Sequence, residues 1–273
     1  MQVSQTAQRA PEGAVLLRSD AGGVATLTLN RPQARNALSE ALIDALAREL
    51  DAIADDRTVK AVIVTGAPGP CFSSGHDLKE ITARRSDPDR GRAYFEDLLG
   101  RCSAMMQQIV RLPQPVIAAV ESLATAAGCQ LVASCDLAVA GEEARFCTPG
   151  VHIGLFCSTP MVALSRNLAR KHAMEMLLTG ETIPAADALR MGLVNRVVPA
   201  GHALDGAKRF AATIASKAAP VLAIGKRAFY EQLEMGLTDA YAHASRVMTE
   251  NMLARDAEEG IGAFLEKRQP RWE

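Results

Sequence analysis

Two apolar, strand-like runs, each followed by a tight turn and a helical pattern, place the strongest constraint on this chain. Val116–Val120 (VIAAV) is short, apolar and partly β-branched, which is typical of a buried strand. After a polar break at Glu121-Ser122, the triplet Ala126-Ala127-Gly128 opens the apolar run at residues 129–133, which we interpret as a buried helix. The pattern predicts a strand, a small-residue turn and a helix start within residues 115–136.

A second junction repeats this order earlier in the chain. Residues 61–65 (AVIVT) read as a buried strand, and residues 71–80 (CFSSGHDLKE) pass through a tight turn into a helical pattern. A helix start leaves backbone N–H groups unpaired, so two such turns can offer two donors to one oxygen, as stabilising a thioester enolate requires. Close packing of helix on strand is the alternative explanation of each small-residue turn taken alone.

The composition indicates the class of protein, its partners and its cellular compartment. The 273 residues are 48% hydrophobic and 22% charged, which is ordinary for one large globular domain with or without a helical appendage. A net charge of −1 gives no reason to expect nucleic acid or an anionic membrane as a partner. The six cysteines form no CxxC pair, so reduced thiols and a cytoplasmic protein are expected.

The N-terminal residues give a weak and ambiguous signal. They contain no apolar core of signal-peptide length, and no run in the chain is long enough to span a bilayer. Arg9 and the lack of acids before Glu12 are features of a transit peptide, but the segment is short and we interpret it as a frayed end.

The rest of the chain predicts a mixed α/β fold that becomes helical toward its end. Two strands joined by a Gly-Gly turn at residues 20–23 predict a hairpin, and Ser39 is placed to cap the following helix. The charged residues 84–92 predict a mobile loop near the site or a plain solvated connection. Beyond Val198 the patterns are helical only.

The chain resembles the enoyl-CoA hydratase/isomerase (crotonase) family over about 240 residues, because several motifs occur in the family's order and spacing. The motifs are LNRP with NAL at residues 29–38, FSSGHDLKE at 72–80, PVIAAV at 115–120, LLTG at 177–180, GLVNRVV at 192–198, and EGI with FLEKR at 259–268.

The resemblance implies an α/β fold in which ββα units wind into a spiral. Residues 1–200 would form the spiral core with a CoA-thioester site, and residues 201–273 a helical region for trimerisation and pocket closure. It also implies an acyl-CoA substrate, no cofactor or metal, and a homotrimer or a dimer of trimers. A fold does not fix a reaction, so the site residues decide the chemistry.

By resemblance, the backbone N–H groups of His76 and Gly128 form an oxyanion hole, with Ala127 where the family usually has another glycine. The His76 ring is a possible further donor. Asp77 has two interpretations, a helix cap and a base, and capping is the commoner role of such a residue. Ser74 lies in the same turn and is expected to contact the substrate.

Three residues are candidates for holding the CoA portion. Lys79 matches a family position near CoA phosphate, while Phe264 and Lys267 lie in the C-terminal segment that often closes over the CoA site in the family. A lysine suits phosphate as a point charge, although a solvated surface lysine is the alternative for each.

Two catalytic glutamates of the family are missing. The matching positions hold Gln130 and Gly150. An amide can orient a water but cannot take its proton, and glycine has no side chain to contribute. General acid-base catalysis supplies about two to four powers of ten per group, so hydratase activity is expected to be very weak unless another residue substitutes.

Three nearby residues are candidate substitutes: His152, Cys157 and Ser158. Histidine has the right pKa range for a base and cysteine is a competent nucleophile, while some relatives use an aspartate at the position of Ser158. Lining of the acyl pocket is the alternative for all three. The sequence therefore predicts an acyl-CoA-processing protein, nominally an enoyl-CoA hydratase with weak or altered chemistry. The alternatives are a noncatalytic acyl-CoA binder or regulatory subunit and, as the least favoured, a purely structural oligomer.

Overall fold

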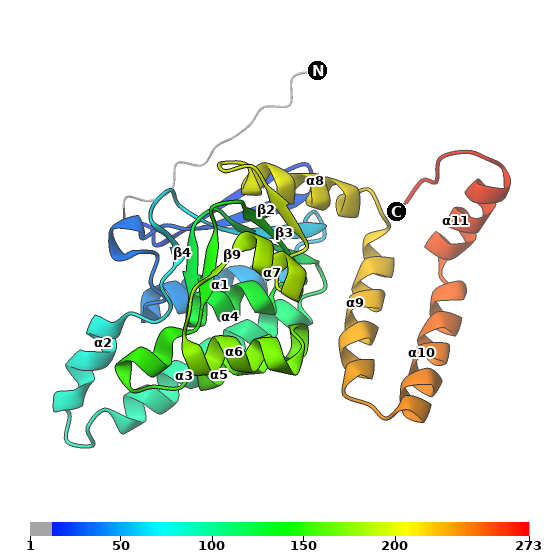
Figure 1. Cartoon of the computed structure of the whole chain (residues 1–273). Helices are drawn as coiled ribbons and strands as arrows, with labels where there is room; N and C mark the ends of the chain where they lie inside the picture. The colour runs from blue at the N-terminus through cyan, green and yellow to red at the C-terminus, as the bar shows by residue number, and fades with distance from the viewer. Residues whose placement is uncertain (1–12, 273) are drawn as a thin grey trace.

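A computed structural model describes residues 13–272. Its centre is a six-stranded sheet with the order β1-β2-β3-β5-β7-β10 (Figure 1). The strands are β1 (Leu16–Ala21), β2 (Val24–Leu29), β3 (Ala61–Gly66), β5 (Val116–Val120), β7 (Leu137–Gly141) and β10 (Arg196–Val198). β1 and β2 form the antiparallel hairpin predicted from the sequence, and every other pair in this sheet is parallel.

The central strands are buried on both faces, which explains their uninterrupted apolar sequences. All five residues of β5 are buried, and its Ile117 pairs with Ile63 of β3 on one side and Leu137 of β7 on the other. Helix α8 (Ala203–Ala215) covers one face through Ala203, Ala207 and Ala211. The opposite face packs against the main apolar core.

A second, smaller sheet with the order β4-β6-β8-β9 lies beside the first. Its strands are β4 (Cys71–Ser73), β6 (Leu123–Thr125), β8 (Arg145–Cys147) and β9 (Ile183–Pro184). Strands of two or three residues carry too little periodicity to be recognised in a sequence, so the sequence did not predict this sheet. β4 and β6 lead into the two helix starts of interest.

Helices of the core surround these sheets (Figure 1). They are α1 (Glu40–Ala54), α2 (Leu78–Ala83), α3 (Arg92–Arg111), α4 (Ala127–Ser134), α5 (Ser158–Asn167), α6 (Arg170–Thr179) and α7 (Ala185–Met191), with short 3-10 turns η1 (Pro32–Ala34), η2 (Arg84–Ser86) and η3 (Pro149–Ile153). The predicted cap of α1 is confirmed, because Ser39 Oγ accepts a hydrogen bond from the Leu42 amide at 3.3 Å.

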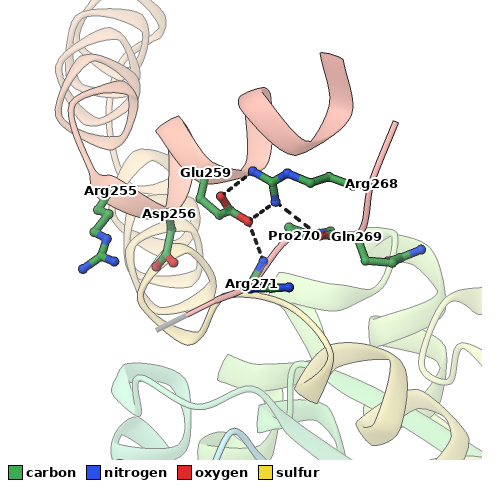
Figure 2. A pocket seen from close by; sticks show the side chains of 7 residues that line it. All are labelled: Arg255, Asp256, Glu259, Arg268, Gln269, Pro270 and Arg271. Carbon is green, nitrogen blue, oxygen red and sulfur yellow. Dashed lines mark hydrogen bonds and ion pairs between the residues drawn. The ribbon is translucent and has the colours of Figure 1, made fainter. Parts of the chain in front are cut away.

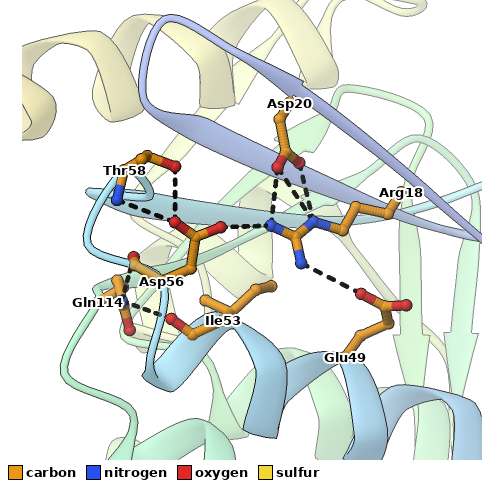
Figure 3. Close-up of polar contacts among 7 residues, drawn as sticks. All are labelled: Arg18, Asp20, Glu49, Ile53, Asp56, Thr58 and Gln114. Atoms are coloured by element: carbon orange, nitrogen blue, oxygen red, sulfur yellow. Dashed lines mark hydrogen bonds and ion pairs between the residues drawn. The ribbon is translucent and has the colours of Figure 1, made fainter. Parts of the chain in front are cut away.

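A polar network fixes the edge hairpin to the end of α1 (Figure 3). Arg18 of β1 donates to Asp20 of its own strand, to Glu49 of α1 at 3.3 Å and to Asp56 just beyond α1 at 3.1 Å. Gln114 donates to the Ile53 carbonyl at 2.7 Å, which closes the end of the same helix. The first strand is therefore held in register with the core by partly buried charges as well as by its apolar face.

The last three helices, α9 (Ala219–Leu233), α10 (Leu237–Met252) and α11 (Arg255–Leu265), stand apart from the core as an arm, drawn in orange to red in Figure 1. The arm is joined to the core through Lys226 of α9, whose Nζ lies 2.7 Å from Asp136 Oδ2. Tyr230 donates to the other Asp136 oxygen at 2.9 Å, and the Val116 amide also donates to this carboxylate. Burial lowers the Lys226 pKa, an effect that the neighbouring Asp136 carboxylate opposes.

The C-terminal tail returns along α11 to the core (Figure 2). Arg268 makes two hydrogen bonds to Glu259 of α11, at 2.6 and 2.9 Å, and the Arg271 amide donates to Glu259 at 2.7 Å. The Trp272 indole N–H then donates to the Ser216 carbonyl at the end of α8 at 2.9 Å. A cavity of about 630 Å³ lies between α11 and this strap, which we define as residues 268–272.

The boundary between the part of the chain that packs on the central sheet and the part that stands apart lies after α8. The predicted division after residue 200 falls before α8, which packs on the central sheet, so the helices that stand apart begin at α9. No described helix is both long and apolar enough to cross a membrane.

Candidate functional site

The two predicted helix starts lie against each other. A Cβ built at Gly75, before α2, would lie 2.9 Å from Ala126 Cβ and 3.0 Å from the Ala127 amide nitrogen. A Cβ built at Gly128 would overlap the Ser73 carbonyl oxygen at the end of β4. The turn after β4 and the start of α4 therefore touch, and both contacts require glycine.

This contact joins the two turns that carry the main-chain amides assigned by the resemblance to an oxyanion hole. The Gly128 amide lies in the first turn of α4, where backbone N–H groups have no partner within the helix. Across the described chain, neither this amide nor that of His76 donates a hydrogen bond to another residue. Two unpaired donors from adjoining turns suit an anionic oxygen.

The residue before α4 holds a strained backbone conformation. Ala126 has φ 51° and ψ −120°, a region that side chains with a Cβ rarely occupy. The Ala126 amide donates to the Cys147 carbonyl at 3.0 Å, and its own carbonyl accepts from the Gln130 amide at 3.0 Å. Hydrogen bonds from a neighbouring strand and from the helix therefore hold the turn that aims the Gly128 amide.

The side chain of His76 is partly exposed, but its Nε2 atom is buried. Burial lowers the pKa of its imidazole below the ordinary value, and its Nε2 has no hydrogen-bond partner within residues 13–272. A neutral ring can donate or accept one hydrogen bond at this atom. The ring is therefore chemically able to supply the further donor anticipated from the sequence.

The carboxylates that neighbour the site in the sequence accept hydrogen bonds at helix ends. Asp77 caps α2 by accepting from the Lys79 amide at 3.1 Å and pairs with Arg31 at 3.1 Å, so the capping interpretation is confirmed. Glu80 accepts from the Glu40 amide at the start of α1. Glu121 accepts from the Gly201 and Ala203 amides at the start of α8. All three carboxylates serve helix ends.

Gln130 lies on α4 and is only 4% exposed. Its main-chain carbonyl accepts from Ser134 Oγ at 2.8 Å, while its side-chain Oε1 has no partner among the described residues. A helical side chain leans toward the N-terminus of its helix, and the N-terminus of α4 carries the turn at Ala126 and Ala127. Gln130 is thus a neutral hydrogen-bonding group at the same helix end as the Gly128 amide.

Gly150 is buried in η3, and the space beside it is already filled. A Cβ at this position would lie 2.9 Å from the Leu155 carbonyl oxygen and 3.0 Å from Cys157 Sγ. A glutamate therefore could not enter without moving the backbone. The thiol of Cys157 occupies the place where a side chain of residue 150 would begin.

Cys157 belongs to a group of buried thiols from three further segments: Cys71 of β4, Cys129 of α4 and Cys147 of β8. Burial raises the pKa of Cys157, an effect that a hydrogen bond from the Gly150 backbone opposes. Burial likewise raises the pKa of Cys129 and Cys71, and the structure describes all six cysteines without a disulfide. A raised pKa makes Cys71, Cys129 and Cys157 poor nucleophiles near neutral pH, because the thiolate is the reactive form.

The other two candidate substitutes are exposed. His152 lies against the end of α6, because a Cβ added at Gly180 would meet its Nε2 at 2.8 Å. Ser158 begins α5, and its Oγ donates to the Phe156 carbonyl at 3.3 Å. Neither contact places these side chains beside the Gly128 amide.

The predicted CoA-binding residues divide between two distant parts of the chain. Lys79 is exposed on α2, and Ser74 lies in the turn before it, where its amide donates to the Arg35 carbonyl at 3.0 Å. Phe264 is 81% exposed near the end of α11, and Lys267 follows that helix. Figure 1 places α2 and α11 at opposite ends of the molecule, so one chain does not bring these two groups together.

Two features of the site were not found from the sequence. Thr125 is 9% exposed and has a buried hydroxyl without a partner within residues 13–272, immediately before the strained Ala126. The triplet Ala126-Ala127-Gly128 signalled a turn but not a positive φ at an alanine. A glycine at position 126 would have been the usual signal.

Comparisons with known proteins show what this chain is similar to. The family model described as enoyl-CoA hydratase/isomerase matches residues 19–273. The Xenopus laevis protein named enoyl-CoA hydratase domain-containing protein 3, mitochondrial, is 48% identical over 92% of this chain and 83% of its own length. A crystal structure of an enoyl-CoA hydratase from Mycobacterium smegmatis has a TM-score of 0.89 and 51% identity, covering 94% of this chain and 98% of that one. The human domain-containing protein 3 has a TM-score of 0.89 and 46% identity, covering 94% of this chain and all of its own.

The relatives contradict the predicted location and confirm the predicted fold and resemblance. The cytoplasmic location predicted from the composition is wrong, because the similar proteins from frog, rat, human and zebrafish are named mitochondrial. The residues read as a frayed end rather than a transit peptide, 1–12, lie outside the described part of the chain. The α/β fold and the resemblance are confirmed: the chain belongs to the enoyl-CoA hydratase/isomerase (crotonase) family.

Proposed function

We propose that this protein binds acyl-CoA thioesters in an oxyanion hole formed by the His76 and Gly128 amides, and that it hydrates 2-enoyl thioesters weakly. The contact between the Gly75 turn and the start of α4 supports this proposal, because the two touching turns each carry a main-chain amide without a partner among the described residues. Such donors stabilise the negative charge that develops on a thioester oxygen when its α-carbon becomes enolate-like.

Weak hydration follows from the groups around that hole. Hydration needs a group that takes a proton from water and a group that returns one to the α-carbon. Gln130 can orient a water but cannot accept its proton, and Gly150 offers no side chain. The adjoining carboxylates of Asp77, Glu80 and Glu121 are committed to helix ends.

A noncatalytic acyl-CoA binder is the second candidate, and Gln130 favours it, because its buried Oε1 has no partner among the described residues. Gln130 provides a buried neutral contact without any capacity for proton transfer. The two candidates share the binding site and differ only in turnover, so one experiment with two readings separates them.

The test compares wild-type protein with Gln130→Glu, using calorimetry for binding and the loss of enoyl absorbance for hydration of crotonyl-CoA. Binding by both proteins is expected, with wild-type hydration about two to four powers of ten slower than in the variant. Absence of wild-type turnover with intact binding supports the noncatalytic binder. Absence of thioester binding overturns both candidates.

The choice of a single variant follows from the structure. Adding Gly150→Glu would force its Cβ to within 2.9 Å of the Leu155 carbonyl oxygen and would confuse loss of fold with loss of activity. Gln107→Glu on the exposed face of α3 is the matched control, since it adds the same charge away from the site. It is expected to leave both binding and turnover at wild-type values.

Assembly into a homotrimer or a dimer of trimers is part of the same proposal. The arm exposes large apolar side chains, among them Leu237 at 76%, Leu253 at 79% and Phe264 at 81%. An exposed apolar surface of this kind is typical of a subunit interface. In an assembly, α11 of one chain could cover the site of another and bring its Phe264 and Lys267 to the CoA of that site. Sedimentation at several concentrations tests this, and a single-chain mass throughout would contradict it.

A further inference from the structure

The carboxylate of Asp136, which follows the end of α4, joins the arm to the core. Its Oδ2 accepts hydrogen bonds from Lys226 Nζ and from the Val116 amide, both at 2.7 Å, and its Oδ1 accepts from the Tyr230 hydroxyl at 2.9 Å. The side chains of Lys226 and Asp136 are only 7% and 14% exposed. One largely buried group therefore connects α9 of the arm with the start of β5 and the end of α4.

Lys226 also holds the end of a neighbouring helix. Its Nζ donates to the carbonyl of Ile109 in the last turn of α3 at 2.9 Å and to the carbonyl of Gln114, just before β5, at 3.1 Å. An ammonium group has three donors, so the bonds to Asp136, Ile109 and Gln114 use all of them. Since α3 packs against α4, this single side chain of the arm fixes both helices relative to the central sheet.

Helix α4 links this junction to the candidate oxyanion hole. All of its residues, Ala127–Ser134, are buried, and the Gly128 amide lies in its first turn. The helix has 8 residues and is about 12 Å long, so a tilt of about 5° at one end moves the other end by about 1 Å. A misplacement of this size in a group that meets a reacting atom can cost about a hundredfold in rate.

The direction of the Gly128 amide depends on both ends of α4. At the N-terminal end, the Cys147 carbonyl accepts from the Ala126 amide at 3.0 Å, and the Ser73 carbonyl lies against Gly128. At the C-terminal end, the helix leads into the Asp136 junction. A buried ion pair is a costly way to attach an arm, because apolar residues of similar volume often stabilise a protein as well. Its hydrogen bonds have preferred directions, however, so it suits holding a helix end in one position.

We infer that Lys226, assisted by Tyr230, is a positioning residue for the oxyanion hole: through Asp136 it fixes the C-terminal end of α4 and thereby the direction of the Gly128 amide. The inference rests on the proposed function, since it assumes that a thioester oxygen binds to this amide. In this role the two side chains act through α4, without contacting the thioester. Attachment of the arm and binding of the thioester carbonyl are then coupled, so that loosening one weakens the other.

Calorimetric titration of the full-length protein with butyryl-CoA and with its thioether analogue S-butyl-CoA tests the inference. The thioether lacks the carbonyl oxygen, so wild-type protein is expected to bind butyryl-CoA about tenfold more tightly. Lys226→Met keeps an unbranched side chain and removes the ammonium group, and the ratio of the two affinities is expected to fall close to one. Tyr230→Phe removes one hydrogen bond to Asp136 and is expected to reduce the ratio about threefold. The affinity for the thioether is expected to stay at its wild-type value in both variants.

Arg166→Ala is the matched control, because it removes a different contact between the core and the arm, the exposed pair with Glu234, and should retain the wild-type ratio. Far-UV circular dichroism confirms the fold of each variant, and Tyr230→Phe alone is sufficient for the test if Lys226→Met does not fold. A purely structural role lowers stability without changing the ratio, so a wild-type ratio in the folded variants overturns the inference and leaves the proposed function intact. Equal affinity of the two ligands for wild-type protein, or failure of both to bind, overturns the proposed function as well.

Discussion

The spiral core and the C-terminal arm are both rich in apolar residues, yet they use them in opposite ways. In the core, all of β5 is buried and Phe72 is 2% exposed. In the arm, α9 and α10 bury no residue completely and α11 buries only Ala263. An amphipathic pattern therefore shows that a helix has an apolar face without showing which surface covers that face.

The two regions also differ in what holds them in place. The core rests on continuous apolar packing between its sheets and helices. The arm rests on the Lys226, Asp136 and Tyr230 contact at α9 and on the strap that ends in Trp272. Substitutions in the two regions should consequently change the free energy of unfolding by different amounts. The experiments below measure these changes.

The largest expected effect comes from a matched pair of phenylalanine substitutions. Phe72→Ala opens a cavity in the core and is expected to lower the free energy of unfolding by about 3–5 kcal/mol. Phe264→Ala, at a side chain that is 81% exposed, is expected to change it by less than about 0.5 kcal/mol in the single chain. Guanidinium unfolding at dilute concentration measures both. If both variants lost a similar free energy of unfolding at every protein concentration, the Phe264 side chain would not be exposed in the single chain.

Lys226→Ala should cost almost as much, although Lys226 belongs to the arm. Its side chain is 7% exposed, and removing it leaves the Asp136 carboxylate buried without its cation, at a cost of about 3 kcal/mol. The control is Arg166→Ala, because its pair with Glu234 is exposed and should contribute less than about 1 kcal/mol. Urea unfolding compares them, and equal losses would mean that α9 is not anchored by this ion pair.

A smaller effect, of opposite sign, is expected at the turn before α4. Ala126→Gly relieves the strain of a positive φ, and after the entropy cost of glycine it should stabilise the protein by about 1 kcal/mol. Ala127→Gly, one position further into the helix, should instead destabilise by about 0.5–1 kcal/mol. Thermal unfolding gives both values, and a loss of stability in Ala126→Gly would refute the strain.

The smallest effect concerns the strap. Trp272→Phe removes one exposed hydrogen bond and should lower stability by less than about 1 kcal/mol. Trp272 is the only tryptophan of the chain, so its emission in the wild-type protein reports the strap alone. In urea this emission is expected to change before the far-UV circular dichroism does. Coincident transitions would show that the arm and the core unfold as one unit.

Lowering the pH gives a second test of the strap through the same Trp272 emission. Hydrogen bonds from Arg268 and the Arg271 amide lower the pKa of Glu259 to about 2. The stability due to this depressed pKa is present above the ordinary glutamate range and is lost as the pH falls through about 2. The tryptophan emission of the wild-type protein should therefore be the same at mildly acidic pH as at neutral pH.

Much of the fold followed from the sequence, because the relevant signals are local. Apolar runs predicted β3 and β5, a Gly-Gly turn predicted the hairpin, and Ser39 and Asp77 were recognised as helix caps. A cap acts on amides two or three residues away, so its effect can be read from neighbouring letters. The order of motifs likewise identified the family.

The chemistry of the site depended on contacts between distant segments. The sequence by itself determined that small residues open α4, and the resemblance matches Gln130 and Gly150 to the family's two glutamate positions. Only the tertiary structure decided that Cys157 fills the space beside Gly150 and that nearby carboxylates serve helix ends. It also decided that Gln130 Oε1 is buried with no partner in residues 13–272. Burial and hydrogen-bond pairing are set by whatever the fold brings alongside a residue, and residues adjacent in space here are often distant in the chain.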